Sequence, residues 1–153
     1  MKEELVLNEH NKQEYPPMHT AEHLLNATMV KMFGCRRSKN AHIERKKSKC
    51  DYLLDKEPSA DEMKEVEVRV NKAIRSNLSV EERFMTQEEA KNSVDLSKLP
   101  DDASAMLRVV YIGDYDACAC IGDHVKNTSE IGEFVISTYS YENGVLRIRF
   151  KLK

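Results

Sequence analysis

Apolar residues recur at helical spacing in two stretches of the chain. From Met18 to Phe33 they return every three or four positions, and Gly34 follows as a helix stop. A second stretch begins with Ser59 and Glu62 at the spacing of a capping box, and its apolar stripe continues to about residue 77. The pattern therefore predicts two helices, one in the first third of the chain and one near its middle.

Alternation of apolar and polar residues predicts strands in the rest of the chain. The clearest signal is Asn143-Gly144, a dipeptide typical of tight hairpin turns, with alternating residues on both sides. A second capping box, at Thr86 and Glu89, follows an extended piece. The predicted strands run through residues 41–43, 52–54, 80–85, 106–112, 115–120, 133–141 and 145–153. We therefore expect an α+β fold, a single two-layer domain with a mostly antiparallel sheet packed against helices.

Composition limits the class of protein. The chain has 153 residues, of which 41% are hydrophobic and 33% charged, as expected for one charged globular domain. No apolar run approaches the roughly 20 residues that a membrane span needs. Residues 1–17 form a polar N-terminal segment without the features of a signal peptide, so we expect a cytoplasmic protein whose domain covers residues 18–153. Because the net charge is −2, any polyanionic partner must meet a local basic patch.

Two pairs of residues have the spacing of metal ligands. His19 and His23 lie four positions apart, which places both imidazoles on one face of the predicted helix. Cys120 and His124 flank a glycine-containing turn, and zinc favours such a mixture of sulfur and nitrogen ligands. Each pair alone is more typical of a surface or capping detail. Three of the five histidines fall into these pairs, so together they predict one zinc site.

A rival motif overlaps the first pair. Residues 19–23 also match H-x-x-E-H, a zinc-peptidase signature in which the glutamate activates water. Those enzymes take a further carboxylate ligand, whereas the second pair here supplies a cysteine and a histidine, which disfavours the peptidase. Glu22 stays a candidate catalytic residue, although a solvated carboxylate near a helix start is the better explanation of it. Cys118 lies on the same side of a strand as Cys120, either as packing or as a spare thiol.

The segments HTAEHLL and CIGDHVKNTSEIGEF, with the hairpin that follows, resemble a known family. They are similar to the editing domain shared by alanyl- and threonyl-tRNA synthetases and, in particular, to the freestanding AlaX proteins. That family has H-x3-H on a helix and C-x3-H in a loop, followed by a run like T-G-E-I-G. The resemblance extends from about Met18 to Lys153. This chain departs from it at Cys-Ile-Gly-Asp-His, where the synthetase-attached domains usually have C-G-G-T-H, and at Ser129, where the run often has glycine.

The resemblance implies a zinc-dependent hydrolase that acts in trans on mischarged aminoacyl-tRNA, chiefly Ser- or Gly-tRNA of the alanine type. Its zinc ligands would be His19, His23, Cys120 and His124. The candidate substrate contacts are Ser38, Asn40 and Thr128, and the Asn40 amide can donate to or accept from a serine hydroxyl. Two alternatives stay open: a non-catalytic, zinc-stabilised tRNA-binding module, and a metallohydrolase of another small ester or amide.

A short basic segment can supply the charge that a tRNA acceptor end needs. Seven lysines and arginines lie between residues 36 and 49, with only Glu44 against them. Such an excess is a natural phosphate contact, although a charge run is often only a solvated face. We expect a monomer or a weak homodimer. The candidate tRNA contacts are Arg36, Arg37, Lys39, Lys46 and Lys47.

Overall fold

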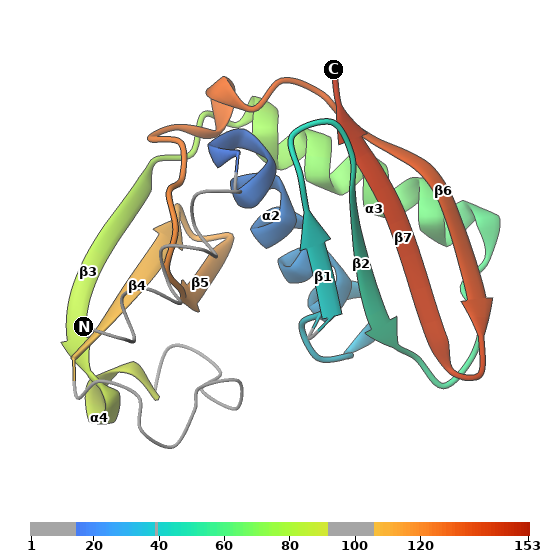
Figure 1. The fold of residues 1–153 in the computed structure, drawn as a ribbon, viewed down its shortest axis with the longest axis horizontal. Coiled ribbons are helices and arrows are strands. Elements are labelled where there is room, and N and C mark those ends of the chain that lie inside the picture. Colours follow the sequence, from blue (N-terminus) through green and yellow to red (C-terminus); the bar gives the residue numbers. More distant parts are fainter. Residues whose placement is uncertain (1–14, 39, 92–105) are drawn as a thin grey trace.

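Among the described residues, two antiparallel sheets and two long helices form the fold, shown in Figure 1 as a computed structural model. The structure describes residues 15–38, 40–91 and 106–153. The helices are α2 (Pro16–Phe33), α3 (Ala60–Arg75) and the short α4 (Gln87–Ala90), with a 3-10 turn, η1 (Thr128–Glu130). The strands are β1 (Asn40–Ile43), β2 (Ser48–Leu53), β3 (Val80–Thr86), β4 (Met106–Ile112), β5 (Asp116–Ala119), β6 (Phe134–Glu142) and β7 (Val145–Leu152).

The larger sheet has the strand order β1-β2-β7-β6, and α2 and α3 cover one of its faces (Figure 1). Alternating side chains of β7 are buried against the helices, as the sequence pattern predicts. Helix α3 contributes an apolar stripe to the same core, in which every third or fourth residue is buried. Burial of each large apolar side chain contributes about 1.5–3 kcal/mol. The principal residues of this core are Tyr52, Val66, Val70, Leu146, Ile148 and Phe150.

The smaller sheet, β3-β4-β5, approaches α2 through its edge strand β5. Helix α2 is therefore enclosed by the larger sheet and α3 on one side and by β5 on another (Figure 1). Nearly every residue of α2 from Met18 to Met29 is buried. Several of these residues are polar, and buried polar groups need partners. The partners of these polar groups define the candidate site.

The predicted α+β class, with antiparallel pairing and helices packed against it, is confirmed. The strands divide into two sheets, where the sequence pattern suggested one. Both capping boxes are present, at Ser59 with Glu62 and at Thr86 with Glu89. The tight hairpin turn is confirmed by positive φ values at Asn143 and Gly144, 54° and 79°. Predictions for residues 1–14 and 92–105 lie outside the described residues, and the boundary between residues 17 and 18 stays a prediction.

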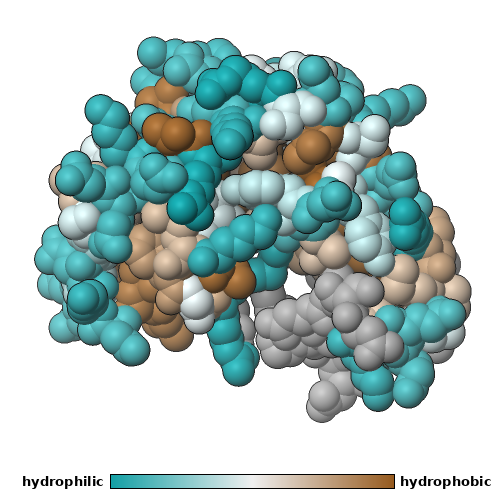
Figure 2. All heavy atoms as spheres, turned by 180° about the vertical axis from the view of Figure 1, so that it is seen from behind, coloured by the Kyte–Doolittle hydropathy of each residue, from teal (hydrophilic) through white to brown (hydrophobic). Residues whose placement is uncertain are grey.

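Hydrophilic side chains cover much of the face seen in Figure 2, and hydrophobic side chains gather in separate groups toward its two flanks. The exposed large hydrophobic residues include Leu53 on β2 and Phe84 on β3. Among the described residues, no helix has both the length and the apolar character needed to cross a membrane.

Candidate metal centre and adjoining pocket

The two predicted ligand pairs converge. His19 and His23 lie one turn apart on α2, and Cys120 and His124 lie just after β5, so the four residues form a group that we call the His/Cys cluster. One potential ligand atom from each lies within 4.8 Å of the others. Sγ of Cys120 is 3.4 Å from Nε2 of His124, close to the roughly 3.6 Å implied by tetrahedral zinc with ordinary bond lengths. The cluster can therefore hold one metal ion.

Each imidazole of the cluster has an oxygen atom next to its Nδ1. Nδ1 of His19 lies 3.0 Å from the carbonyl oxygen of Asp123. Nδ1 of His23 faces Oδ2 of Asp116 at 3.4 Å, an ion-pair contact, and has no hydrogen-bond partner among the described residues. Metal-binding histidines usually direct their second ring nitrogen to a carboxylate, carbonyl or similar oxygen. This outer set of oxygens leaves the Nε2 atoms for a metal, so the residues present fit one.

Thr20 determines the tautomer of His124. Its hydroxyl donates to the carbonyl oxygen of Pro16 at 3.1 Å and accepts the backbone N–H of Val125 at 3.2 Å. Nδ1 of His124 lies 2.9 Å from the same hydroxyl oxygen. When the single hydroxyl hydrogen is directed to Pro16, Nδ1 of His124 is the donor in this contact. Nε2 then carries the lone pair that faces Cys120, as metal binding requires.

The buried charges of the cluster depend on one another. Burial disfavours the Cys120 thiolate, but His23 and His19 outweigh it and lower the pKa of Cys120 to about 6. Burial would also lower the pKa of His23, but the thiolate and the Asp116 carboxylate raise it well above its ordinary value. Burial and the two neighbouring imidazoles lower the pKa of His124. The site therefore stabilises a thiolate, the form of cysteine that binds metals.

We expect the metal-free protein to lose the thiolate of Cys120 near pH 6, rather than near the ordinary pKa of 9.0. Because this pKa is lowered by folding, its stabilising contribution is present above pH 9 and is lost as the pH falls through about 6. Thiolate ultraviolet absorbance measures the transition, and Cys120→Ser gives the difference spectrum. A Cys120 midpoint near 9 would contradict the arrangement of charges.

Asp116 and Thr20 are the site residues that the sequence analysis missed. Asp116 had a detectable signal, because it lies two residues before Cys118 in the strand predicted over residues 115–120, where Asp116, Cys118 and Cys120 share a face. Thr20 had no signal of its own, since its role depends on contacts with His124 and Val125, more than 100 residues away.

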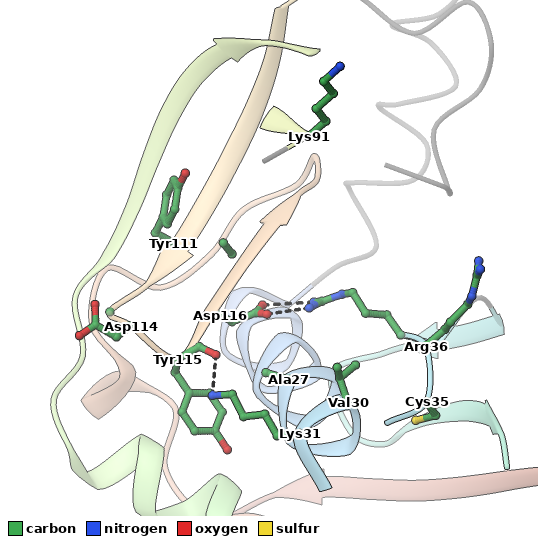
Figure 3. Close-up of a pocket in the computed structure, with 13 residues that line it drawn as sticks. Ala27, Val30, Lys31, Cys35, Arg36, Lys91, Tyr111, Asp114, Tyr115 and Asp116 are labelled. Carbon is green, nitrogen blue, oxygen red and sulfur yellow. Dashed lines mark hydrogen bonds and ion pairs between the residues drawn. The ribbon is translucent and has the colours of Figure 1, made fainter. Parts of the chain in front are cut away.

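A pocket of about 830 Å³ adjoins the cluster on the side of Asp116. It lies between the second half of α2 and the turn that joins β4 to β5, and Figure 3 shows the residues that line it. The two dashed lines from Asp116 in Figure 3 mark its ion pair with Arg37. Lys31 donates to the carbonyl oxygen of Tyr115 and lies over its ring, while Arg36 points away from Asp116 (Figure 3). The pocket thus combines basic and aromatic side chains.

Comparison with known proteins connects this site to a family. Residues 107–149 match the family described as the threonyl and alanyl tRNA synthetase second additional domain. An alanine–tRNA ligase of Psychromonas ingrahamii is 36% identical over 132 residues, covering 85% of this chain and 15% of the ligase. For the ligase of Treponema denticola the identity is 32% over 149 residues, with coverages of 96% and 25%.

A protein of Saccharomyces cerevisiae, named as the alanyl-tRNA editing protein alaX, is 32% identical over 149 residues. The chain is an AlaX-like editing domain. The match covers 87% of this chain and 32% of the yeast protein, so the editing domain spans less than a third of each of these three relatives. This homology supports an editing role.

The structure places the predicted substrate and catalytic residues in different surroundings. Ser38 is buried beside α2, where its N–H donates to Asn26. Asn40 is exposed on β1 and donates to Asp51. Glu22 lies on α2 between the two ligand histidines, and Nδ2 of Asn26 donates to its Oε2 at 3.3 Å. Glu22, Asn26 and Ser38 thus form one polar group along α2. The carbonyl oxygen of Asn40 accepts the Ser38 hydroxyl at 3.1 Å, while the side chain of Asn40 pairs with Asp51.

Thr128 is not brought to the cluster by its contacts. Its hydroxyl lies 3.3 Å from the carbonyl of Ala73 and 3.0 Å from that of Ile74, and it accepts the N–H of Leu78 at 2.9 Å. The side chain is fully buried at the end of α3. These bonds satisfy carbonyl groups that a helix end leaves open. Thr128 therefore stabilises the end of α3, and its role as a substrate contact stays a prediction.

The basic residues between positions 36 and 49 differ in exposure and in their contacts. Arg36, Lys46 and Lys47 are exposed, as a phosphate contact requires. Arg37 is mostly buried and its charge is paired with Asp116. Lys39 lies outside the described residues. Arg45, in the same turn as Lys46 and Lys47, lies over the ring of Tyr15, one helical turn before His19.

Proposed function

We propose that this editing domain binds zinc in the His/Cys cluster and hydrolyses the ester bond of mischarged aminoacyl-tRNA. The substrate would be an alanine tRNA that carries serine or glycine. The observation that carries the proposal is the cluster itself. Four ligand atoms lie within 4.8 Å of one another, and each Nδ1 has an oxygen beside it. Zinc is the metal that this set of one thiolate and three imidazoles favours.

The chain's own residues would prepare the site for hydrolysis. Bound zinc supplies Lewis-acid polarisation or a water of lowered pKa. Asp123, Asp116 and Thr20 hold the three imidazoles in orientation through their Nδ1 atoms. In the overall reaction, water adds its oxygen to the acyl carbon, the bond to the ribose oxygen breaks, and a proton passes to that oxygen. An aminoacyl ester is already labile, so positioning contributes a large share of the catalysis.

The amino acid would lie beside the polar group on α2. The Asn26 side chain is held by three contacts, because Oδ1 accepts from Ser38 and Tyr52 while Nδ2 donates to Glu22. Glu22 is partly exposed, and its carboxylate can attract the ammonium group of an aminoacyl ester. We therefore propose Ser38 as a substrate contact, and we propose that Glu22, the catalytic candidate, contacts the substrate as well. Asn40 and Thr128 stay predicted substrate contacts.

The acceptor end of the tRNA would bind to exposed lysine and arginine side chains. Lys46 and Lys47 lie in the turn that approaches the start of α2, and Arg36 lies at the rim of the pocket. The chain therefore offers exposed positive charge near both ends of α2 for phosphate contacts. We propose aminoacyl-tRNA as the partner, bound by a monomer or a weak homodimer.

One observation favours a second function. Four protein ligands usually enclose a structural zinc ion, whereas catalytic zinc commonly keeps a position open for water or substrate. The same cluster therefore supports a zinc-stabilised module that binds tRNA without turnover. The two functions predict different outcomes with charged tRNA.

We expect the zinc-loaded domain to release serine or glycine from Ser- or Gly-tRNA of the alanine type and to leave Ala-tRNA intact. Release of the labelled amino acid measures the reaction, and chelation of zinc is expected to abolish it. The matched control is the same tRNA without protein, since spontaneous hydrolysis is appreciable. Tight tRNA binding without release would favour the binding module. Indifference to tRNA, with cleavage of a small ester, would favour a different metallohydrolase.

A further inference from the structure

A buried ion pair connects the wall of the pocket to the His/Cys cluster. Nη1 of Arg37 lies 2.6 Å from Oδ1 of Asp116, and Nη2 lies 3.2 Å from Oδ2. Only 13% of the Arg37 side chain and 5% of the Asp116 side chain are exposed. Oδ2 of Asp116 is in turn 3.4 Å from Nδ1 of His23. One carboxylate therefore contacts both a buried guanidinium and a metal-ligand candidate.

The geometry of the pair restricts the carboxylate. A guanidinium that meets both carboxylate oxygens fixes the plane of the carboxyl group as well as its position. The backbone restricts it too, because Asp116 pairs with Ile112 at the first residue of β5, directly after the turn. With the carboxylate fixed, Oδ2 limits the orientations that the His23 ring can adopt. Nδ1 of His23 has no hydrogen-bond partner among the described residues, and Oδ2 of Asp116, at 3.4 Å, is its ion-pair contact.

We propose that Arg37 and Asp116 are positioning residues of the metal centre: Arg37 orients the Asp116 carboxylate, and this carboxylate holds His23 with Nε2 toward the other ligands. The inference rests on the proposed zinc function. It assigns Arg37, one of the basic residues that the sequence suggested for tRNA, to the metal centre. Its neighbour Arg36 is exposed and points away from Asp116, so it remains available to a phosphate (Figure 3).

A purely structural ion pair would have a different effect. Arg37 follows α2 and Asp116 begins β5, so their contact also ties together segments 79 residues apart. Loss of such a tie lowers the free energy of unfolding but leaves the metal's ligand geometry unchanged. Loss of a positioning pair changes the metal affinity and the spectrum of the bound metal. Removal of outer partners of metal-binding histidines typically weakens binding by about 10–100-fold.

The test uses Arg37→Met and Asp116→Asn in the full chain, with zinc affinity from competition with a chelator and the absorption spectrum of bound Co²⁺. We expect both variants to bind zinc about 10–100-fold more weakly and to shift the Co²⁺ bands. Arg37→Lys should have a smaller effect, since a lysine keeps the charge but not the two-point contact. Wild-type affinity and spectrum in these variants would overturn the inference.

Two control variants distinguish a loss of positioning from a loss of positive charge or of fold stability. Arg147→Met removes a similar two-point ion pair, that of Arg147 with Asp51 at 2.8 Å and 2.9 Å on the larger sheet. Arg36→Met removes the same charge next to Arg37, and both controls should keep the wild-type metal affinity. If a single variant does not fold, Arg37→Met with Asp116→Asn leaves no unpaired buried charge and gives the same readouts. A wild-type chain that binds neither Zn²⁺ nor Co²⁺ would overturn the proposed function as well.

Discussion

Replacement of His19 and Cys120 together by alanine is expected to abolish bound zinc. Each residue comes from one of the two ligand pairs, so the double variant leaves one histidine on α2 and one in the loop after β5. Two imidazoles alone do not provide the four ligands of a protein zinc site. Elemental analysis of the purified protein measures the result, and we expect a fall from about one zinc per chain to background.

The control for this experiment is a double variant of the same composition. His42→Ala with Cys118→Ala also removes one histidine and one cysteine, but His42 is exposed on β1 and Cys118 is outside the cluster. Cys118 lies on β5, two residues before the cluster's cysteine, and burial raises the pKa of its thiol, so it favours the neutral form. This control should keep its full zinc content. Retention of zinc by the first variant would refute the proposed ligand set.

Local patterns predicted the elements of the fold well. The capping boxes and the Asn-Gly turn act over a few residues, so their signals are contained in the sequence near them. Division into two sheets depends instead on which strands pair. β2 pairs with β7, so that Cys50 lies opposite Ile148, and no local pattern specifies that partner. Local patterns therefore could not predict the number of sheets.

In the candidate site, too, local patterns predicted only the contacts between residues that are close in the sequence. Spacing identified both ligand pairs, because a helix turn and a short loop each bring two side chains together locally. The role of Arg37 could not be predicted, because its counter-ion Asp116 lies 79 residues away. Thr128 illustrates the same limit, since the carbonyl groups that its hydroxyl contacts belong to residues 55 and 54 positions away on α3. Residue type alone does not reveal whether a polar group is available to a ligand.

Chelation of zinc is expected to lower the thermal stability of the domain strongly. The metal would connect α2 to the loop after β5, and the contact between His19 and Asp123 already links positions 104 residues apart. A ligand that binds only the folded state stabilises it by about 4 kcal/mol when its free concentration is about 1,000 times its Kd. For a chain of this size, that free energy corresponds to a midpoint shift of about 8–16 °C.

Differential scanning calorimetry of the zinc-loaded protein, with and without chelator, measures this shift. The His19 and Cys120 double variant supplies the control, since its midpoint should respond to neither zinc nor chelator. Hydrogen exchange tells where the stabilisation acts: amides of α2 and of residues 120–125 should lose protection first, because the metal joins these two segments. The larger sheet should lose less, because its core also includes apolar residues of α3, a helix that supplies no ligand to the cluster. An unchanged midpoint after complete zinc removal would show that the cluster forms without the metal, which would leave Asp116, Asp123 and Thr20 as the groups that hold it together.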